Sequence, residues 1–512
     1  MYTFSNKLKT FAFVLMALGL LGLAYGFLTA PKTTEDVEKI LAESHHDGHH
    51  AAAPAHGEAE KAAKEIAHDV AAGEKVSDTA VATVAAHAEA SLKQEADSAA
   101  VHADTTHAAV AHATEAADHD DAHKAEAHHG AEADAHAAHQ KHLEHVLHQL
   151  QNKPWAALYV ACIFFMLISV GVLAFYAIQW AAQAGWSPVL FRVMEGITAY
   201  LLPGSIIFFI LLVLSGMHMN HLFTWMGEGV TDPASPNYDA IIAGKSGFLN
   251  VPFFLIRALI FLAGWNIYRY ISRKNSLAQD NATDDSFYKK NFKAAAAFLA
   301  FFIVSESIAS WDWIMSVDPH WYSTLFGWYV FASFFVSGIT TIAFVTLYLK
   351  SRGYLEYVNT SHIHDLAKFM FGISVFWTYL WFSQFMLMWY SNIPEEVTYF
   401  VTRIENYKLP FFGMVVMNFV LPILILINTD FKRLTWIVVM AGIIILTGHY
   451  IDFFNMIMPA TVGDQWFIGA AEIGALMFFL GLFIFVVFSA LTKAPLLAKR
   501  NPLIEESKHF HY

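Results

Sequence analysis

Apolar segments of about twenty residues alternate with short polar segments along most of the chain. They occupy residues 11–28, 155–182, 188–217, 250–272, 292–316, 321–349, 365–390, 408–428, 433–458 and 467–491. Each is close to or above the ~20 residues that a helix needs to cross the hydrocarbon core of a bilayer. The pattern therefore predicts an all-α integral membrane protein with about ten transmembrane helices.

The first apolar segment follows Lys7 and Lys9, an arrangement that a secretory signal peptide also shows. The apolar run from Phe11 to Leu28 is long for the hydrophobic part of a signal peptide. We therefore expect residues 1–30 to be retained as the first transmembrane helix.

Residues 31–153 differ in kind from the rest, because they are rich in Ala, His, Asp and Glu and hold 19 of the 27 histidines. So few apolar side chains cannot offset the entropy lost on ordering a compact domain. We expect a largely disordered or helical spacer outside the membrane. The spacing of His136, His139, His142 and His145 would place them on one helix face, so metal binding or proton buffering at the membrane surface is the alternative.

Composition supports the membrane assignment. Hydrophobic residues make up 56% of the chain and charged residues 15%, whereas soluble domains have ~25% charged residues. The net charge of −13 arises largely in residues 31–153, and nothing suggests nucleic-acid binding. The single cysteine, Cys162, excludes an internal disulfide, a Cys₄ iron–sulfur site and covalent haem attachment. We expect no metal site, so partner subunits would hold any redox metals.

Lysine and arginine are concentrated at alternate helix ends. They precede the first helix and follow the fourth, sixth, eighth and tenth, whereas the opposite short loops hold only Lys245, Arg403 and Lys408. Basic residues favour the cytoplasmic side of a membrane. Both termini are therefore predicted to be cytoplasmic, with residues 31–153 and the segment Asp318–His320 on the other side.

Ionisable side chains inside the spans are the main functional candidates, because each costs about 2.5–3.5 kcal/mol to insert. The candidates for a polar ligand pocket or a proton path in the outer half are Arg257, Glu306, Asp312, Asp318, His320, His449, Asp452 and Glu472. Arg257 and Glu306 lie at depths that would allow an ion pair, and His449 and Asp452 share a helix face. Six of these candidates lie at similar depth in four helices, which suggests a shared polar pocket or a proton path if they converge in space. The alternative is a set of paired, structural charges.

Four further residues are candidates for cytoplasmic proton uptake. Arg192 and Glu195 share one face of the third helix, and Asp365 and Lys368 begin the seventh. A local ion pair and ordinary interfacial anchoring are the respective alternatives. Pro203-Gly204 is expected to interrupt the third helix.

These residue types suit proton transfer coupled to a redox reaction, since His, Asp and Glu can accept protons as electrons leave a donor. A transmembrane cytochrome b is not expected, because His449 is the only histidine well inside a span after residue 153. The aromatic residues Trp311, Trp313, Trp321, Tyr322, Trp328 and Tyr329 predict an interfacial belt, with a stacking platform for a planar ring as the alternative.

The stretch from Trp311 to Tyr329, WDWIMSVDPHWYSTLFGWY, resembles a motif of the ActF-like, NrfD- and polysulfide-reductase-related membrane subunits of bacterial alternative complex III. The resemblance covers roughly residues 155–491. It implies a subunit, not catalytic alone, of a respiratory quinol:cytochrome c oxidoreductase in the bacterial inner membrane. Implied partners are haem c subunits, an iron–sulfur subunit, a second NrfD-like subunit, lipid and a terminal oxidase, with menaquinone or ubiquinone as the quinone. Residues 31–153 depart from this family pattern.

The resemblance also implies two four-helix bundles flanked by the first and last helices. The expected parts are residues 1–30 (first helix), 31–153 (spacer), 154–320 (first bundle), 321–459 (second bundle) and 460–512 (last helix and tail). Two other functions remain open. An ion-coupled secondary transporter would also carry broken helices and midplane charges, although no inverted repeat is evident in the sequence. A structural scaffold subunit would carry only paired charges.

Overall fold

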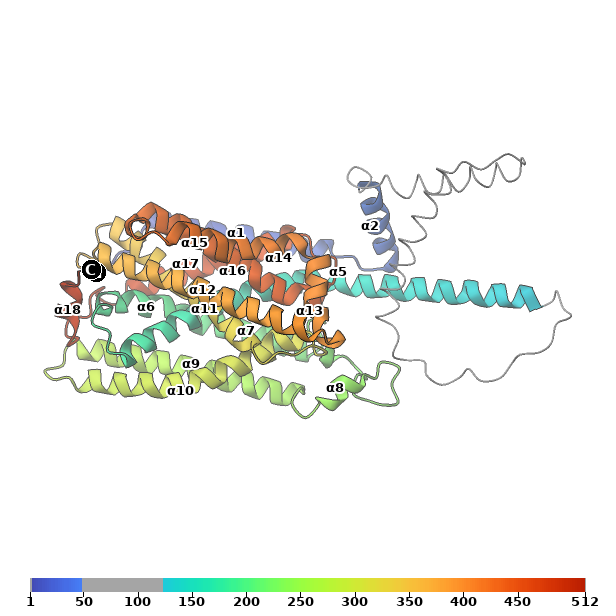
Figure 1. Cartoon of the computed structure of the whole chain (residues 1–512), viewed down its shortest axis with the longest axis horizontal. Coiled ribbons are helices and arrows are strands. Elements are labelled where there is room, and N and C mark those ends of the chain that lie inside the picture. The colour runs from blue at the N-terminus through green and yellow to red at the C-terminus, as the bar shows by residue number, and fades with distance from the viewer. Residues whose placement is uncertain (1, 48–122, 512) are drawn as a thin grey trace. The chain divides into compact units, whose positions relative to one another are not determined.

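The computed structural model of the chain describes residues 2–47 and 123–511. It is 77% helical, and its described residues contain no strand (Figure 1). Ten of the described helical segments are long and apolar enough to cross a membrane, which confirms the predicted fold class. Most of the predicted spacer, residues 48–122, lies outside the described residues.

Six of the described candidate membrane-spanning helices are α1 (Asn6–Thr29), α9 (Val251–Gln279), α11 (Phe326–Ser351), α12 (Thr360–Ser391), α16 (Thr435–Val462) and α17 (Ala470–Leu491). The other spans comprise α5 (His123–Ala181), α6 (Phe191–Ile197) with α7 (Leu201–Gly216), α10 (Ser286–Trp313), and α14 (Lys408–Val415) with α15 (Leu421–Leu426). Shorter helices are α2 (Thr34–Asp47), α8 (Ala240–Gly244), α13 (Pro394–Glu405) and α18 (Ile504–Lys508).

The chain forms two compact units, one of Met1–Ala30 with His148–Tyr512 and one of Pro31–Leu147. Helix α5 is continuous across the expected boundary at residue 153. In the second unit, His139 Nε2 on α5 lies 3.7 Å from Glu38 Oε1 on α2. Both side chains are exposed, so this pair contributes little to stability.

Residues 154–320, the first bundle, hold most of α5 together with α6–α7, α9 and α10, and residues 321–459, the second bundle, hold α11, α12, α14–α15 and most of α16. Contacts between α10 and α11 join the two. Figure 1 shows α9 and α10 side by side as a hairpin. The most buried spans are α5 and α11, with 94% and 89% of their apolar windows buried. They approach closely because Gly171 faces Gly338; a Cβ on Gly338 would lie 2.8 Å from the Val172 nitrogen.

Two spans are interrupted just before a proline. A 3₁₀ turn over Thr198–Tyr200 separates α6 from α7 ahead of Pro203, which confirms the predicted break in this span. A π-helical turn over Val416–Val420 separates α14 from α15 ahead of Pro422. Proline has no N–H to donate to the carbonyl four residues earlier, so the regular ladder fails at both places. The second break was not predicted, although Pro422 was a visible signal.

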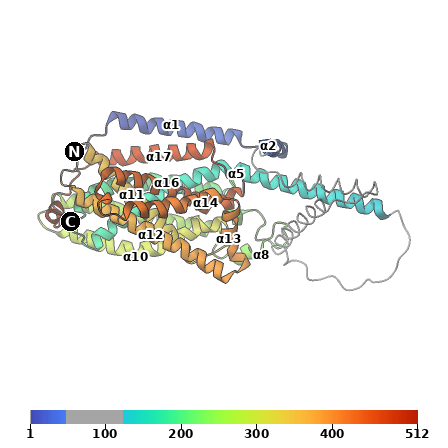
Figure 2. The same ribbon diagram turned by 45° about the horizontal axis from the view of Figure 1, so that its top comes forward.

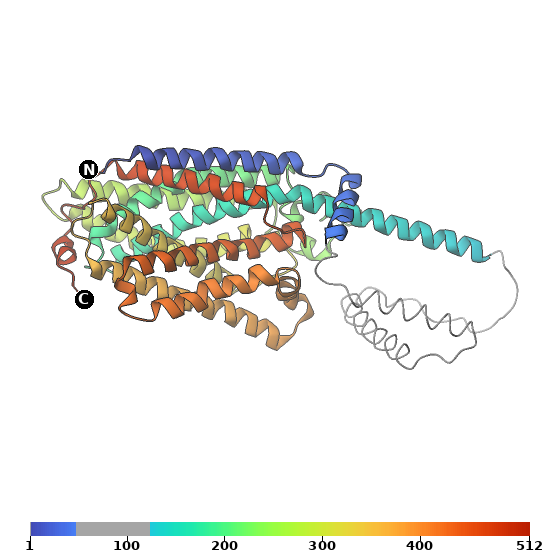
Figure 3. The same ribbon diagram turned by 90° about the horizontal axis from the view of Figure 1, so that it is seen from above.

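Helices α1 and α17 pack along much of their lengths, as Figures 2 and 3 show from two sides. Both figures mark the two chain ends at the same end of the ten spans, as an even number of crossings requires. Glycines Gly19, Gly22 and Gly26 of α1 face α17, and Gly474 of α17 faces α1. Small residues allow such close backbone contact between helices in a membrane.

Substituting Gly474 by valine is expected to push α1 away from α17 and to destabilise the protein by about 1–3 kcal/mol. The reason is that a Cβ at this position would lie 2.7 Å from the backbone nitrogen of Leu23, where no flexible side chain can yield. Gly372→Val is the control, because nothing lies within 4 Å of a Cβ there. Thermal unfolding in detergent would measure both, and equal midpoints would contradict the prediction.

Candidate functional site

A buried carboxylate in the second bundle, Asp452 on α16, accepts three hydrogen bonds. Tyr329 and Ser333 of α11 and Trp377 of α12 each donate one, with Ser333 Oγ and Trp377 Nε1 both 2.8 Å from Asp452 Oδ2. Asp452, Ser333 and Trp377 are fully buried, and Tyr329 is nearly so. A carboxylate that accepts several hydrogen bonds can remain ionised away from water. Among the described residues, no Lys or Arg forms an ion pair with Asp452.

His449 extends this network by one step. Its Nδ1 lies 2.9 Å from Ser333 Oγ and 3.6 Å from Asp452 Oδ2. Ser333 has one proton, which it donates to Asp452, so it accepts from His449 Nδ1 when Asp452 is ionised. His449 Nε2 is buried and has no hydrogen-bond partner in the described part of the chain. The three side chains therefore form a continuous chain of exchangeable protons, His449–Ser333–Asp452.

A closed polar space adjoins Tyr329 on the side toward α13. Three buried polar atoms in its lining have no hydrogen-bond partner among the described residues: Trp381 Nε1, Gln384 Oε1 and Asn455 Oδ1. Arg403 of α13 also lines it, and its Nε donates to the Asn455 carbonyl at 2.9 Å. Buried polar atoms are normally paired, and water often supplies the missing partner when a space is large enough. This space is narrow, so hydrating it would require it to open.

Glu306, in the first bundle, is a second buried carboxyl. Its only hydrogen-bond donors in the described residues are hydroxyls, Ser307 at 3.2 Å and Ser310 at 3.4 Å. It lines a small space with Trp265, Trp313 and other apolar side chains of α5, α9, α10 and α11. No described basic side chain forms an ion pair with it. A carboxyl in such surroundings is a candidate for reversible protonation.

Arg257 pairs with Asp312, whereas the sequence had suggested Glu306 as its partner. The contact is bidentate, with Nε 2.6 Å from Oδ2 and Nη2 2.9 Å from Oδ1. Arg257 Nη1 also donates to the Phe248 carbonyl at 3.0 Å, and the guanidinium lies over the Phe248 and Phe253 rings. Asp312 lies one residue from the C-terminal end of α10. This pair therefore fits the structural alternative.

The segment Asp318–His320 lies outside the spans. His320 Nε2 is 2.6 Å from Asp239 Oδ2, and Lys245 Nζ donates to the Pro319 carbonyl at 2.5 Å. Burial tends to raise the pKa of Asp239, but hydrogen bonds from Ile242 and His320 outweigh it and the net pKa is lowered. Burial lowers the pKa of Lys245, against the attraction of Asp318 and Asp239. These contacts join the loop before α9 to the loop after α10.

Glu472 caps its own helix. Its Oε2 accepts the Gly469 N–H at 2.8 Å at the start of α17, while Oε1 is buried without a hydrogen-bond partner in the described residues. Lys153 Nζ, also buried, lies over the Phe467 ring near this helix start. Glu472 therefore has a local structural role, like other carboxylates in a first helical turn.

The candidates for cytoplasmic proton uptake form local ion pairs. Arg192 Nη1 is 2.8 Å from Glu195 Oε2, and its Nη2 is 2.6 Å from Asp280 Oδ2. Lys368 Nζ is 2.5 Å from Asp365 Oδ1. The predicted pairing of Arg192 with Glu195 is thus present, extended by an acid that the sequence analysis did not select.

The six intramembrane candidates of the outer half divide into separate groups. These are Arg257 with Asp312, Glu306 alone, His449 with Asp452, and Glu472 alone. Among the described residues, no hydrogen bond or ion pair joins one group to another. The expectation of one shared polar pocket is therefore not met.

Sequence reasoning missed three partners of Asp452. Tyr329 had been assigned to an interfacial belt, and Ser333 and Trp377 had not been selected. The belt interpretation fits Tyr322 and Trp328, which are exposed, but Trp313, Trp321 and Tyr329 are buried. The available signal was the spacing of Tyr329 and Ser333, which places both on one face of α11.

Comparison of the sequence with models of protein families and with curated protein sequences gives no match in either case.

Proposed function

We propose that the chain is a membrane subunit of a bacterial respiratory quinol oxidoreductase and that it carries a proton path in its second bundle. The network His449–Ser333–Asp452 is the observation that carries the proton path. It joins an imidazole, a hydroxyl and a carboxylate by short contacts, with no described Lys or Arg paired to the carboxylate. The resemblance of Trp311–Tyr329 to alternative complex III supports the respiratory assignment.

In this proposal, partner subunits transfer the electrons and this chain transfers protons. Oxidation of one menaquinol or ubiquinol releases two electrons and two protons. The electrons pass to haem c and iron–sulfur centres of partner subunits, because Cys162 alone cannot hold a cluster. This chain supplies groups that accept and pass protons: Asp452 and His449 in the second bundle and Glu306 in the first. Burial and neighbouring donors adjust such groups to their task.

A scaffold role is the second candidate, and a different observation favours it. Arg257 with Asp312, and Arg192 and Arg273 with Glu195 and Asp280, are ion-paired charges that hold helices together. These contacts require no proton transfer. The proton path depends on Asp452, His449 and Glu306, whereas the scaffold role depends on the ion-paired residues. The two candidate functions therefore predict loss of function on substitution at different positions.

Purification from native membranes in mild detergent tests the respiratory assignment. We expect a complex that contains c-type haem, visible in its absorption spectrum, and that becomes reduced when a quinol is added. A colourless protein that purifies alone would refute the assignment, and ion transport would then be the function to assay. A haem-containing complex that quinol does not reduce would also contradict it.

A further inference from the structure

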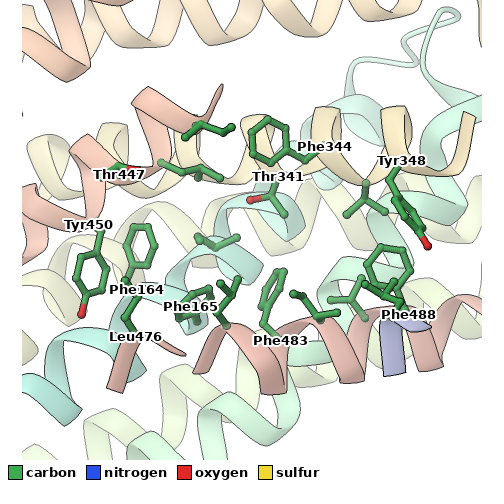
Figure 4. Close-up of a pocket in the computed structure, with 18 residues that line it drawn as sticks. Phe164, Phe165, Thr341, Phe344, Tyr348, Thr447, Tyr450, Leu476, Phe483 and Phe488 are labelled. Atoms are coloured by element: carbon green, nitrogen blue, oxygen red, sulfur yellow. The ribbon is translucent and has the colours of Figure 1, made fainter. Parts of the chain in front are cut away.

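An apolar groove lies between α5, α11, α16 and α17, with Leu8 of α1 at its edge (Figure 4). Its volume is about 440 Å³, and its lining is almost entirely aliphatic and aromatic. Tyr450, Phe164 and Leu476 lie toward one end, and Tyr348 and Phe488 lie at the other (Figure 4). Ile443 and Thr447 on its rim are exposed, so the groove reaches the membrane-facing surface.

One end of this groove is bordered by two cations. Phe488 packs on Tyr348 and on Phe4, with ring centroids 5.1 Å and 6.0 Å away. Lys9 Nζ lies 5.3 Å from the Phe4 ring centroid, and the Arg352 guanidinium lies 5.7 Å from that of Tyr348. Lys9 of α1 and Arg352 at the end of α11 therefore both lie against the aromatic cluster at this end of the groove.

We propose that this groove binds an anionic phospholipid, with an acyl chain along the apolar lining and the phosphate at Lys9 and Arg352. Close contact between an alkyl chain and an apolar wall is stabilising. Each basic residue near a membrane surface attracts anionic lipid. Lys9 belongs to α1 and Arg352 lies at the end of α11, more than 300 residues later in the chain, so the bound head group would hold α1 against the second bundle.

The position of the charges favours a phospholipid over other amphiphiles. A quinone has a neutral head group that requires hydrogen-bond donors rather than cations. A zwitterionic lipid would gain less from two cations than one with net negative charge. Both are retained below as outcomes that would overturn the proposal.

The head-group half of the proposal is tested by native mass spectrometry of the purified protein, or of the complex in which it is isolated. Delipidated samples are titrated with phosphatidylglycerol or phosphatidylethanolamine. The wild type should prefer phosphatidylglycerol, and Lys9→Gln with Arg352→Gln should reduce that preference by about fivefold per cation. Lys289→Gln with Lys290→Gln removes the same charge from exposed positions on α10 and should leave the preference unchanged. An equal loss in both pairs would overturn the proposal.

The acyl-chain half is tested by filling the groove from its rim. Thr447→Phe adds a ring at an exposed position of the lining, so misfolding is not expected. Native mass spectra should then show at least a tenfold loss of the tightly held phospholipid. Val304→Phe, which places a ring on an exposed face of α10, should retain it. Retention in Thr447→Phe, or release of a quinone instead of a phospholipid from the wild type, would refute the proposal.

Discussion

Replacing Arg257 by alanine is expected to lower the free energy of unfolding by about 3–5 kcal/mol. The change leaves the fully buried Asp312 without its bidentate partner, and the Phe248 carbonyl loses a donor. Most of this lost stability comes from the unpaired charge that remains in a dry interior, and less of it from the lost attraction of the ion pair. Unfolding in detergent, followed by circular dichroism, measures the effect.

Two controls separate this explanation from general damage. Arg257→Met combined with Asp312→Leu removes both charges at similar volume and should recover most of the stability. Lys508→Ala breaks an exposed ion pair with Glu505 and should leave the unfolding midpoint almost unchanged. A double variant as unstable as Arg257→Ala would contradict the assignment of the loss to a buried, unpaired charge.

Replacing Asp452 by asparagine is expected to reduce quinol-driven turnover by roughly 100-fold, the lower range for loss of a positioned proton-transfer group. Asparagine has nearly the same shape, but it offers one accepting oxygen to three donors and has no exchangeable acidic proton. Turnover and proton yield per electron, measured on the purified complex, test this result.

Glu472→Gln is the matched control, because it changes a buried carboxylate to an amide whose oxygen can still accept the Gly469 N–H. It should leave turnover within about twofold of wild type. Glu306→Gln tests the first bundle separately, since a glutamine oxygen can accept the serine hydroxyls without taking up a proton. Unchanged proton yield in both Asp452→Asn and Glu306→Gln would favour the scaffold candidate.

Hydropathy located all ten spans because crossing a membrane imposes a length and composition that are visible in one dimension. The predicted ends of the helices were less accurate than the predicted positions of the spans. Helix α10 begins at Ser286 rather than near residue 292, and α9 continues to Gln279 rather than ending near 272. Polar sequence can continue a helix beyond the membrane, where backbone hydrogen bonds need no apolar surroundings.

Contacts within one turn of a helix were also predictable, as Arg192 with Glu195 shows. Partners on different helices depend on how each helix is rotated about its axis, which depth alone does not determine. Glu306 and Asp312 are both near the depth of Arg257, yet their positions six residues apart face different directions. The same limit hid Trp377 as a partner of Asp452, because α12 and α16 are far apart in sequence.

The glycine contact between α1 and α17 has a consequence for biosynthesis. Helix α1 precedes the other described spans in the chain, yet its most extensive contacts are with α17, and only 17% of the apolar window of α1 is buried in the folded protein. At typical synthesis rates of 5–20 residues per second, α1 waits on the order of a minute before α17 is made. Until then its glycine face is covered only by lipid or by an insertion factor. Truncation before residue 470 would therefore leave α1 inserted but undocked, a state that membrane quality control can recognise.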